Sequence, residues 1–180
     1  MTRHRSSGII VPVEAARPLT DAWAGLLPAP NRALPPHVTA LWPFLPAEAV
    51  DEGVEREIEA LVAGAAAFDF ALARLSEFPD VVFLSPEPTE PFVALTRLLW
   101  RRWPECPPFG GAYPEIVPHL TVALDPDPTT RQAIARTLTE RLPLVARAES
   151  VLLIEEDADG VLRERRRFAL GGHPESAGQT

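Results

Sequence analysis

The chain has 180 residues, of which 46% are hydrophobic and 23% are charged, the size and composition of one ordinary globular domain. Its formal net charge is −8 at pH 7, and such an acidic surface repels polyanions, which argues against broad, non-specific nucleic-acid binding. A small phosphate ligand held in a local pocket stays compatible with this charge.

The cysteine content and the apolar runs indicate the cellular compartment of the protein. Cys106 is the only cysteine, so no internal disulfide can form, as is usual in a reducing cytosol. No apolar run approaches the ~20 residues that a membrane-spanning helix needs. The run IIVPV near the N-terminus is too short for the core of a signal peptide. We therefore expect a cytoplasmic monomer with no membrane partner.

The first half of the chain predicts strands and helices in alternation. Apolar, β-branched runs indicate strands, and apolar residues at helical spacing indicate helices. A proline-rich loop at 29–36 delivers the chain to the second strand in an extended state. In order, we expect a strand at 8–13, a helix at 18–27, a strand at 37–42, a helix at 47–63, and hairpin strands at 68–75 and 81–84.

The second half repeats this kind of pattern. Thr89 is the expected N-cap of the clearest helix, and Asp127 is the expected N-cap of the next. The sequence DADG predicts a hairpin turn near the C-terminus. In order, we expect a helix at 89–103, a Pro- and Gly-rich loop at 106–118, a strand at 119–124, a helix at 127–142, and hairpin strands at 144–155 and 161–170.

The two halves share one order of elements, which predicts a duplicated α/β unit in an α+β fold. Each has a helix, a strand with the motif proline-histidine-apolar-threonine-apolar, a second helix, and two strands joined by a turn. We expect two mainly antiparallel sheets related by a pseudo-twofold axis, with helices outside and a groove between two lobes. The whole chain, 1–180, would form this single bilobal domain, with motif strands near 37–42 and 119–124.

The motif reads PHVTA in the first half and PHLTV in the second, 82 residues later. Residues i and i+2 of a strand point to the same face. His37 and Thr39 therefore share a face, and so do His119 and Thr121, while the apolar residues between them face the helices. Alternation also assigns Trp42 to the apolar side.

If the two polar faces meet across the groove, two imidazoles lie on either side of one ligand. This arrangement suits in-line displacement at phosphorus. A neutral imidazole takes a proton from the attacking hydroxyl or water, and a protonated one gives a proton to the leaving oxygen. Histidine can do both because its ordinary pKa is ~6.5. The threonine hydroxyls can donate to the non-bridging phosphate oxygens.

A structural role is the competing interpretation of the motif. A single histidine in an apolar stretch is more often a hydrogen-bonded structural residue, and threonine is a good strand former. Threonine fills 11 of the 180 positions, so one histidine has roughly a 6% chance of a threonine two residues on. Two such matches among four histidines favour function, although a duplication kept for packing alone stays open.

The paired motif resembles the signature of the two-histidine (2H) phosphoesterases, and most of all their 2′-5′ RNA ligase-like branch, which includes RNA 2′,3′-cyclic phosphodiesterases. HVTALWPF is similar to the first motif of that branch and PHLTVAL to the second, and the shared element order spans about 8–170. The resemblance implies metal- and cofactor-independent hydrolysis of a 2′,3′-cyclic phosphate to a 2′-phosphate, with reversible 2′-5′ ligation in some members. By position, His37 and His119 would be the acid/base pair, and Thr39 and Thr121 would hold the phosphate.

The sequence departs from RNA-acting members of that branch at Leu124, where many of them carry an arginine. Together with the acidic charge, this favours a small cyclic nucleotide or a cyclic phosphate of ADP-ribose, or only the 2′,3′-cyclic phosphate end of an RNA, with no extended nucleic-acid binding. Phe44 and Tyr113 lie next to the motifs in sequence and are candidates to stack on a base.

Other interpretations remain open on the sequence alone. In RERRR at 163–167, alternate arginines share one strand face; they could read phosphate in the groove, but a charged, exposed edge strand is the preferred interpretation. The groove could also bind a cyclic phosphate without turning it over, as a sensor or carrier. A metal-dependent hydrolase would need carboxylate ligands beside the histidines, and neither motif supplies one.

Overall fold

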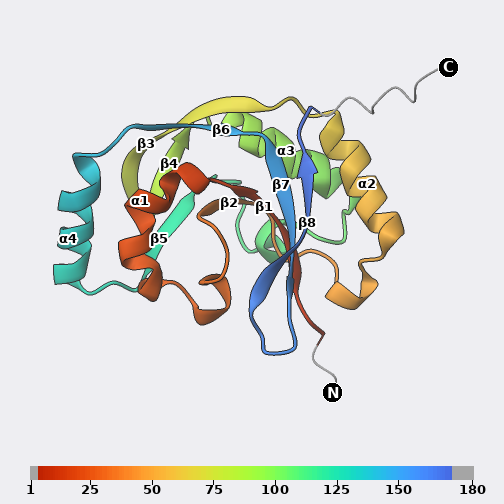
Figure 1. Cartoon of the computed structure of the whole chain (residues 1–180), viewed down its shortest axis with the longest axis horizontal. Coiled ribbons are helices and arrows are strands. Elements are labelled where there is room, and N and C mark those ends of the chain that lie inside the picture. The colour runs from red at the N-terminus through yellow and green to blue at the C-terminus, as the bar shows by residue number, and fades with distance from the viewer. Residues whose placement is uncertain (1–3, 172–180) are drawn as a thin grey trace.

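The structure is a computed structural model that describes residues 4–171 and confirms the α+β class (Figure 1). The expected domain limits, 1–180, extend past these residues at both ends. The strands are β1 (Ser7–Pro12), β2 (His37–Leu41), β3 (Phe68–Phe78), β4 (Val81–Glu87), β5 (Leu120–Leu124), β6 (Leu144–Ala148), β7 (Ser150–Glu156) and β8 (Leu162–Ala169). The helices are α1 (Arg17–Thr20), α2 (Glu52–Ala63), α3 (Glu90–Arg102) and α4 (Pro128–Thr139).

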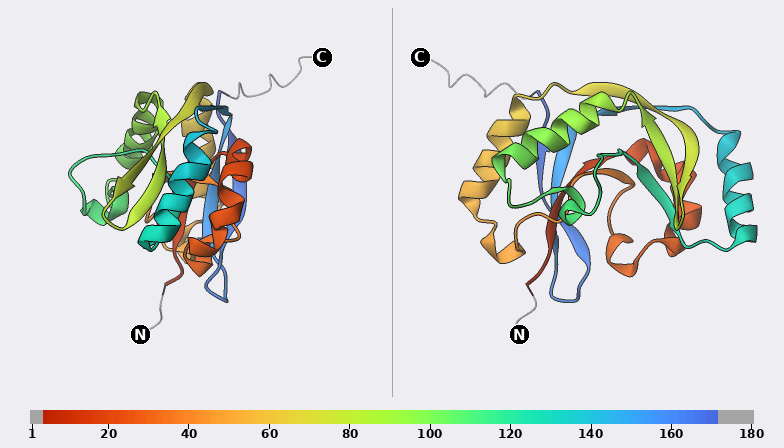
Figure 2. Two further views of the ribbon diagram at one scale, coloured as in Figure 1. Left: turned by 90° about the vertical axis from the view of Figure 1, so that its left-hand side faces the viewer. Right: turned by 180° about the vertical axis from the view of Figure 1, so that it is seen from behind.

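All of these strands join one antiparallel sheet in the order β6-β3-β4-β5-β2-β1-β7-β8. The two motif strands, β2 and β5, are neighbours at its centre and meet through the single pair Val38 and Leu120. These residues are 82 positions apart, so the pseudo-twofold axis passes between equivalent residues. The two expected antiparallel halves are present, but this pairing joins them into one curled sheet (Figure 2).

Strands cross between the halves in a way that short-range patterns do not reveal. The hairpin of β3 and β4 follows the first motif strand but pairs with the second, β5. The strand expected at 144–155 is split at Glu149 into β6 and β7. Strand β6 pairs with β3 at one end of the sheet, and β7 pairs with β1 in the other half. Each half of the sheet is therefore built from both halves of the sequence.

Helices cover the outer face of the sheet. α2 and α3 contact β8 and β2, and α4 contacts β3. Asp127 caps α4 as expected, since its carboxylate accepts the N–H groups of Thr129 and Thr130 at 2.9 and 3.0 Å. Thr89 precedes α3, but its side chain makes no capping hydrogen bond. No helix in residues 4–171 is long and apolar enough to cross a membrane.

Two predicted helices are shorter than expected. The segment at 18–27 forms only the single turn α1 and a 3-10 helix, η2 (Asp21–Leu26), because the chain becomes extended at Leu27 before Pro28. The segment at 47–63 forms a 3-10 turn and then α2, whose N-cap is Asp51. The long loop between β1 and β2 is therefore built of short helical turns and no long helix, and it forms one wall of the site described next.

Candidate active site

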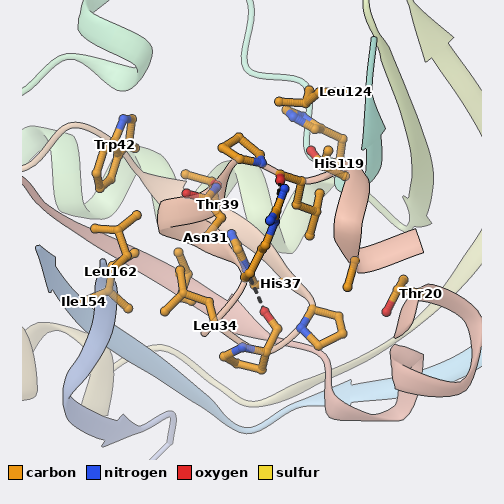
Figure 3. A pocket seen from close by; sticks show the side chains of 18 of the residues that line it. Thr20, Asn31, Leu34, His37, Thr39, Trp42, His119, Leu124, Ile154 and Leu162 are labelled. Atoms are coloured by element: carbon orange, nitrogen blue, oxygen red, sulfur yellow. Dashed lines mark hydrogen bonds between the residues drawn. The ribbon is translucent and has the colours of Figure 1, made fainter. Parts of the chain in front are cut away.

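A pocket of about 290 Å³ lies over the two motif strands at the centre of the sheet (Figure 3). His37 and Thr39 line it from β2, and His119 and Thr121 line it from β5 and the residue before it. The alternation of the motif strands thus brings the predicted polar residues into one cavity, while Val38 and Leu120 are buried on the opposite face.

Each histidine is oriented by the same backbone contact. Nδ1 of His37 lies 2.8 Å from the carbonyl oxygen of Pro35, and Nδ1 of His119 lies 2.8 Å from that of Val117. A carbonyl only accepts hydrogen bonds, so Nδ1 carries the hydrogen and donates it. In both rings Nε2 is left to exchange a proton with a ligand. The repeated motif therefore determines how each imidazole ring is oriented as well as where each histidine lies relative to its strand.

Burial lowers the pKa of both imidazoles below the ordinary value of 6.5. For His37, the hydrogen bond to Pro35 partly opposes this, and the nearby His119 lowers the pKa further. For His119, the hydrogen bond to Val117 opposes the effect of burial. The pair can therefore hold one proton more easily than two, which is the charge state that acid/base catalysis needs.

Three aromatic rings lie around His119, and none of them belongs to the motif. The ring centroids of Phe78 and Phe83 each lie 5.4 Å from that of the imidazole. Phe109 stacks on it at 6.1 Å with an interplanar angle of 23°. Phe109 has a φ of +51°, in the glycine-rich loop before β5, and it lines the pocket. Sequence reasoning missed it, because no pattern shows where such a loop folds back.

A β-bulge interrupts each motif strand at the equivalent residue. On β2, Thr39 pairs with Ile10 and Leu41 with Ile9, so Ala40 is the extra residue. On β5, Thr121 pairs with Phe83 and Ala123 with Val82, so Val122 is the extra residue. A bulge shifts the alternation by one position. The two bulges are 82 residues apart and redirect the strand ends in the same way.

The bulges correct the prediction for Trp42. Its indole is half-buried and lines the pocket instead of joining the main core, and Leu124 lines the pocket from the equivalent position on β5. Figure 3 shows Trp42, Leu34, Ile154 and Leu162 on one side of His37, with His119 and Leu124 on the other.

Phe44 and Tyr113, the predicted base-stacking residues, do not line the pocket. Phe44 is only 6% exposed and packs edge-on against Trp103 in the main core, because β2 ends at Leu41 and strand alternation does not extend to Phe44. This placement removes Phe44 as a candidate ligand contact. Tyr113 is 68% exposed, with its ring 6.0 Å from that of Phe109.

The arginine-rich strand β8 is an edge strand, and its arginines lie away from the pocket. Arg165 contacts Glu55 and Glu155, at 2.8 and 2.9 Å, and Arg166 contacts Glu55 at 3.0 Å. Arg163 and Arg167 pair with other acidic residues. These contacts support the edge-strand interpretation and leave phosphate recognition to other residues.

Neither the cysteine nor a metal ligand set adds to the site. Cys106 is buried, and burial raises the pKa of its thiol, which opposes formation of a nucleophilic thiolate. Among the residues that the structure describes, no group of three or more His, Cys, Asp or Glu side chains is placed to hold a metal ion.

Several solved structures of other proteins share this fold. A search of curated proteins gave no match. A crystal structure of a phosphoesterase is 19% identical with a TM-score of 0.60, over 94% of this chain and 100% of that one. Protein TT0787 of Thermus thermophilus is 20% identical with a TM-score of 0.60, over 94% of this chain and 100% of that one. E. coli LigT complexed with phosphate is 18% identical with a TM-score of 0.57, over 95% of this chain and 100% of that one.

Identities this low show a shared fold alone, whereas the sequence itself identifies the family. The family profile of the 2′-5′ RNA ligase superfamily matches residues 11–160, which is most of the chain and includes both motif strands. The chain therefore belongs to the 2′-5′ RNA ligase superfamily, the two-histidine phosphoesterases.

Proposed function

We propose that the chain is a phosphodiesterase that opens 2′,3′-cyclic phosphates, or related cyclic phosphates, by acid/base catalysis with His37 and His119. The observation that carries this proposal is the matched orientation of the two imidazoles. Each donates its Nδ1 hydrogen to a backbone carbonyl and keeps Nε2 for the ligand, in a pocket that also holds Thr39 and Thr121.

The reaction needs one proton shared by two bases. Nε2 of the neutral histidine takes a proton from water as the water oxygen bonds to phosphorus. Nε2 of the protonated histidine gives its proton to the ribose oxygen as the phosphorus–oxygen bond breaks. A 2′-phosphate and a free 3′-hydroxyl result, and the two histidines have exchanged protonation states. With a 5′-hydroxyl in place of water, the same steps in the same direction make a 2′-5′ bond and release the 3′-hydroxyl, and their reversal breaks that bond and restores the cyclic phosphate.

Thr39 and Thr121 are the proposed phosphate holders. Each hydroxyl lies beside a histidine on the pocket face of its strand, where it can donate to a non-bridging oxygen. Charge on these oxygens grows as the water attacks, so donors fixed in place stabilise the transition state more than the ground state.

A single nucleotide is the substrate size that the site supports. The pocket volume of about 290 Å³ is close to the ~300 Å³ lower end of ordinary small-molecule sites, which suits one nucleotide better than an extended strand. Crystal structures of E. coli LigT complexed with phosphate, with 3′-AMP and with ATP show that a protein of this fold binds small nucleotides. We therefore expect a cyclic mononucleotide or an RNA 2′,3′-cyclic phosphate end.

Steady-state hydrolysis of adenosine 2′,3′-cyclic phosphate in EDTA tests the proposal. We expect the wild type to turn over, and His37→Ala and His119→Ala each to lose about 10²–10⁴ in kcat, the usual contribution of one proton transfer. His4→Ala is the matched control, because His4 is exposed and does not line the pocket. Full activity in both single variants would contradict the acid/base assignment. Tight binding without product would instead identify a sensor or carrier, and loss of activity in EDTA would favour a metal-dependent hydrolase.

A further inference from the structure

One wall of the pocket is formed by the loop between β1 and β2, which brings three charged side chains to it. Arg17, Asp21 and Arg32 line the pocket together with His37. Nε of Arg17 lies 2.6 Å from a carboxylate oxygen of Glu14, so this guanidinium is already paired. Arg32 differs, because its contacts are to the backbone.

The guanidinium of Arg32 is held in place without being neutralised. Its Nε–H donates to the carbonyl oxygen of Leu27 at 3.0 Å, and Nη2 donates to that of Gly25 at 2.9 Å. Within residues 4–171, none of its contacts is to a carboxylate. Arg165, by contrast, pairs with two glutamates. Within the described residues, no paired carboxylate therefore offsets the positive charge of Arg32, in a protein whose formal net charge is −8.

The two backbone contacts leave further N–H groups available. Nη1 and one hydrogen of Nη2 make no hydrogen bond or ion pair within the described residues. A planar guanidinium presents such donors in a fixed fork that matches a phosphate, and a side chain already held by two bonds loses less freedom on binding. Arg32 is therefore prepared to bind an anion.

The anion that Arg32 binds need not be the reacting phosphate. The latter has its own donors in Thr39 and Thr121, on the strands at the floor of the pocket. Arg32 lies five residues before His37, in the loop that forms the wall. Arg32 and the motif strands thus approach a ligand from different elements.

We propose that Arg32 forms a second anion subsite, which binds a further phosphate on the nucleoside that carries the cyclic phosphate. The inference rests on the proposed function and deepens it. It assigns the preferred substrate to nucleoside 2′,3′-cyclic phosphates that also carry a 5′-phosphate.

The test compares adenosine 2′,3′-cyclic phosphate with its 5′-phosphorylated form. We expect the wild type to have a higher kcat/KM for the 5′-phosphorylated substrate by about tenfold, the scale of one charge-assisted contact in a partly exposed site. In Arg32→Met this ratio should fall to about one, and in Arg32→Lys, which keeps a charge without the fork, it should lie in between. Because the contact is electrostatic and partly exposed, the wild-type ratio should also fall as salt is added.

Arg141→Met is the matched control. Arg141 also donates to a backbone carbonyl, that of Pro18 at 2.8 Å, but does not line the pocket, so its loss should leave the ratio unchanged. Arg32 could instead only fasten its loop, or contact the reacting phosphate. In either case Arg32→Met would lower kcat/KM for both substrates equally and leave the ratio at the wild-type value, which would overturn the second subsite.

The two proposals fail in different ways. If the wild type hydrolyses both substrates with equal kcat/KM, the second subsite is wrong and the proposed function stands. If the wild type hydrolyses neither substrate, the proposed function is wrong. Equilibrium binding then tests Arg32 on its own, by comparing the affinity for the 5′-phosphorylated product with that for the product without a 5′-phosphate. If the wild type binds the 5′-phosphorylated product more tightly and Arg32→Met does not, the subsite is still supported. If Arg32→Met keeps the same preference, the subsite is overturned.

Discussion

The substitution Gly8→Ala tests the position of Trp42 at the pocket. Gly8 is a buried residue of β1, and a Cβ atom added to it would lie 2.4 Å from Cε3 of Trp42, 3.1 Å from Cζ3, and 3.3 Å from the carbonyl oxygen of Leu41. Carbon atoms in contact are ordinarily ~3.5–4.0 Å apart, so the indole must move by roughly 1 Å. The β1 backbone cannot easily shift to relieve the clash, because the carbonyl oxygen of Leu41 lies beside the new methyl group. The indole must therefore move, and it moves towards the pocket.

Both stability and substrate affinity should report this displacement. Overpacking of this kind ordinarily costs about 1–3 kcal/mol. For a chain of this length, each kcal/mol lowers Tm by about 2–4 °C, so we expect a fall of about 2–12 °C. The indole also moves into space that a nucleotide would occupy, so the KM for cyclic nucleotides should rise. Thermal unfolding and steady-state kinetics on the same preparation measure the two effects.

A second substitution separates the collision from other costs of Gly8→Ala. Replacing Trp42 by Leu in the same chain removes the colliding ring atoms, so the double variant should be more stable than the sum of the single effects by about 0.5–3 kcal/mol. Gly64→Ala is the control, because its φ is −79° and the nearest atom to an added Cβ is at an ordinary 3.5 Å. An unchanged Tm and KM in Gly8→Ala, or simple additivity in the double variant, would refute this position for the indole.

Further predictions concern the titration of the site and the holding of phosphate. Burial lowers the pKa of both His37 and His119 below 6.5, and the bell-shaped profile of kcat/KM peaks midway between the acid and base pKa values, so the maximum should lie below pH 6.5; a maximum above pH 7 would contradict these shifts. Thr39→Val and Thr121→Val should each lower kcat/KM by about 10²–10³ with little change in Tm, since each removes one donor to the developing charge; wild-type kinetics in either variant would exclude that hydroxyl from phosphate binding. Phe109→Ala should raise the pKa of His119 towards 6.5 by admitting water, as an NMR titration of the ring would show; an unshifted pKa would mean that this ring does not contribute to the burial of His119.

The sequence predicted the parts of the site that depend on short-range alternation. The pairing of His37 with Thr39, and of His119 with Thr121, follows from the period of a strand, and the structure places all of them in one pocket. The repeat of the motif also pointed to two equivalent strands, which are neighbours at the centre of the sheet.

Features that depend on strand pairing could not be predicted in this way. A bulge exists only relative to the partner strand, so no pattern within HVTALWPF shows that Ala40 is the extra residue. This is why alternation assigns Trp42 to the core, whereas the structure places it at the pocket. Phe44, expected at the site because it lies next to the motif, is instead in the core, since β2 ends at Leu41 before it. The separation of β6 from β7 is also non-local, since neighbouring residues join opposite halves of the sheet.

Site residues that lie in irregular loops could not be predicted from the sequence for a related reason. Phe109 reaches His119 through a loop with a positive φ, and Arg32 reaches the pocket wall through backbone contacts to Gly25 and Leu27. Neither position carries a periodic signal. The sequence thus predicts the two motif strands, and the structure adds the walls that would select the ligand.

The most direct test of the central claim is ³¹P NMR of adenosine 2′,3′-cyclic phosphate incubated with the wild type, His37→Ala and His119→Ala in EDTA. Because the two imidazoles approach from different strands, one ribose oxygen should always be the leaving group. We therefore predict a single phosphate monoester with the wild type, the 2′-phosphate that the family resemblance implies, and almost no product with either variant. A mixture of 2′- and 3′-phosphates, or product in both variants at the wild-type rate, would contradict two-histidine acid/base catalysis at this site.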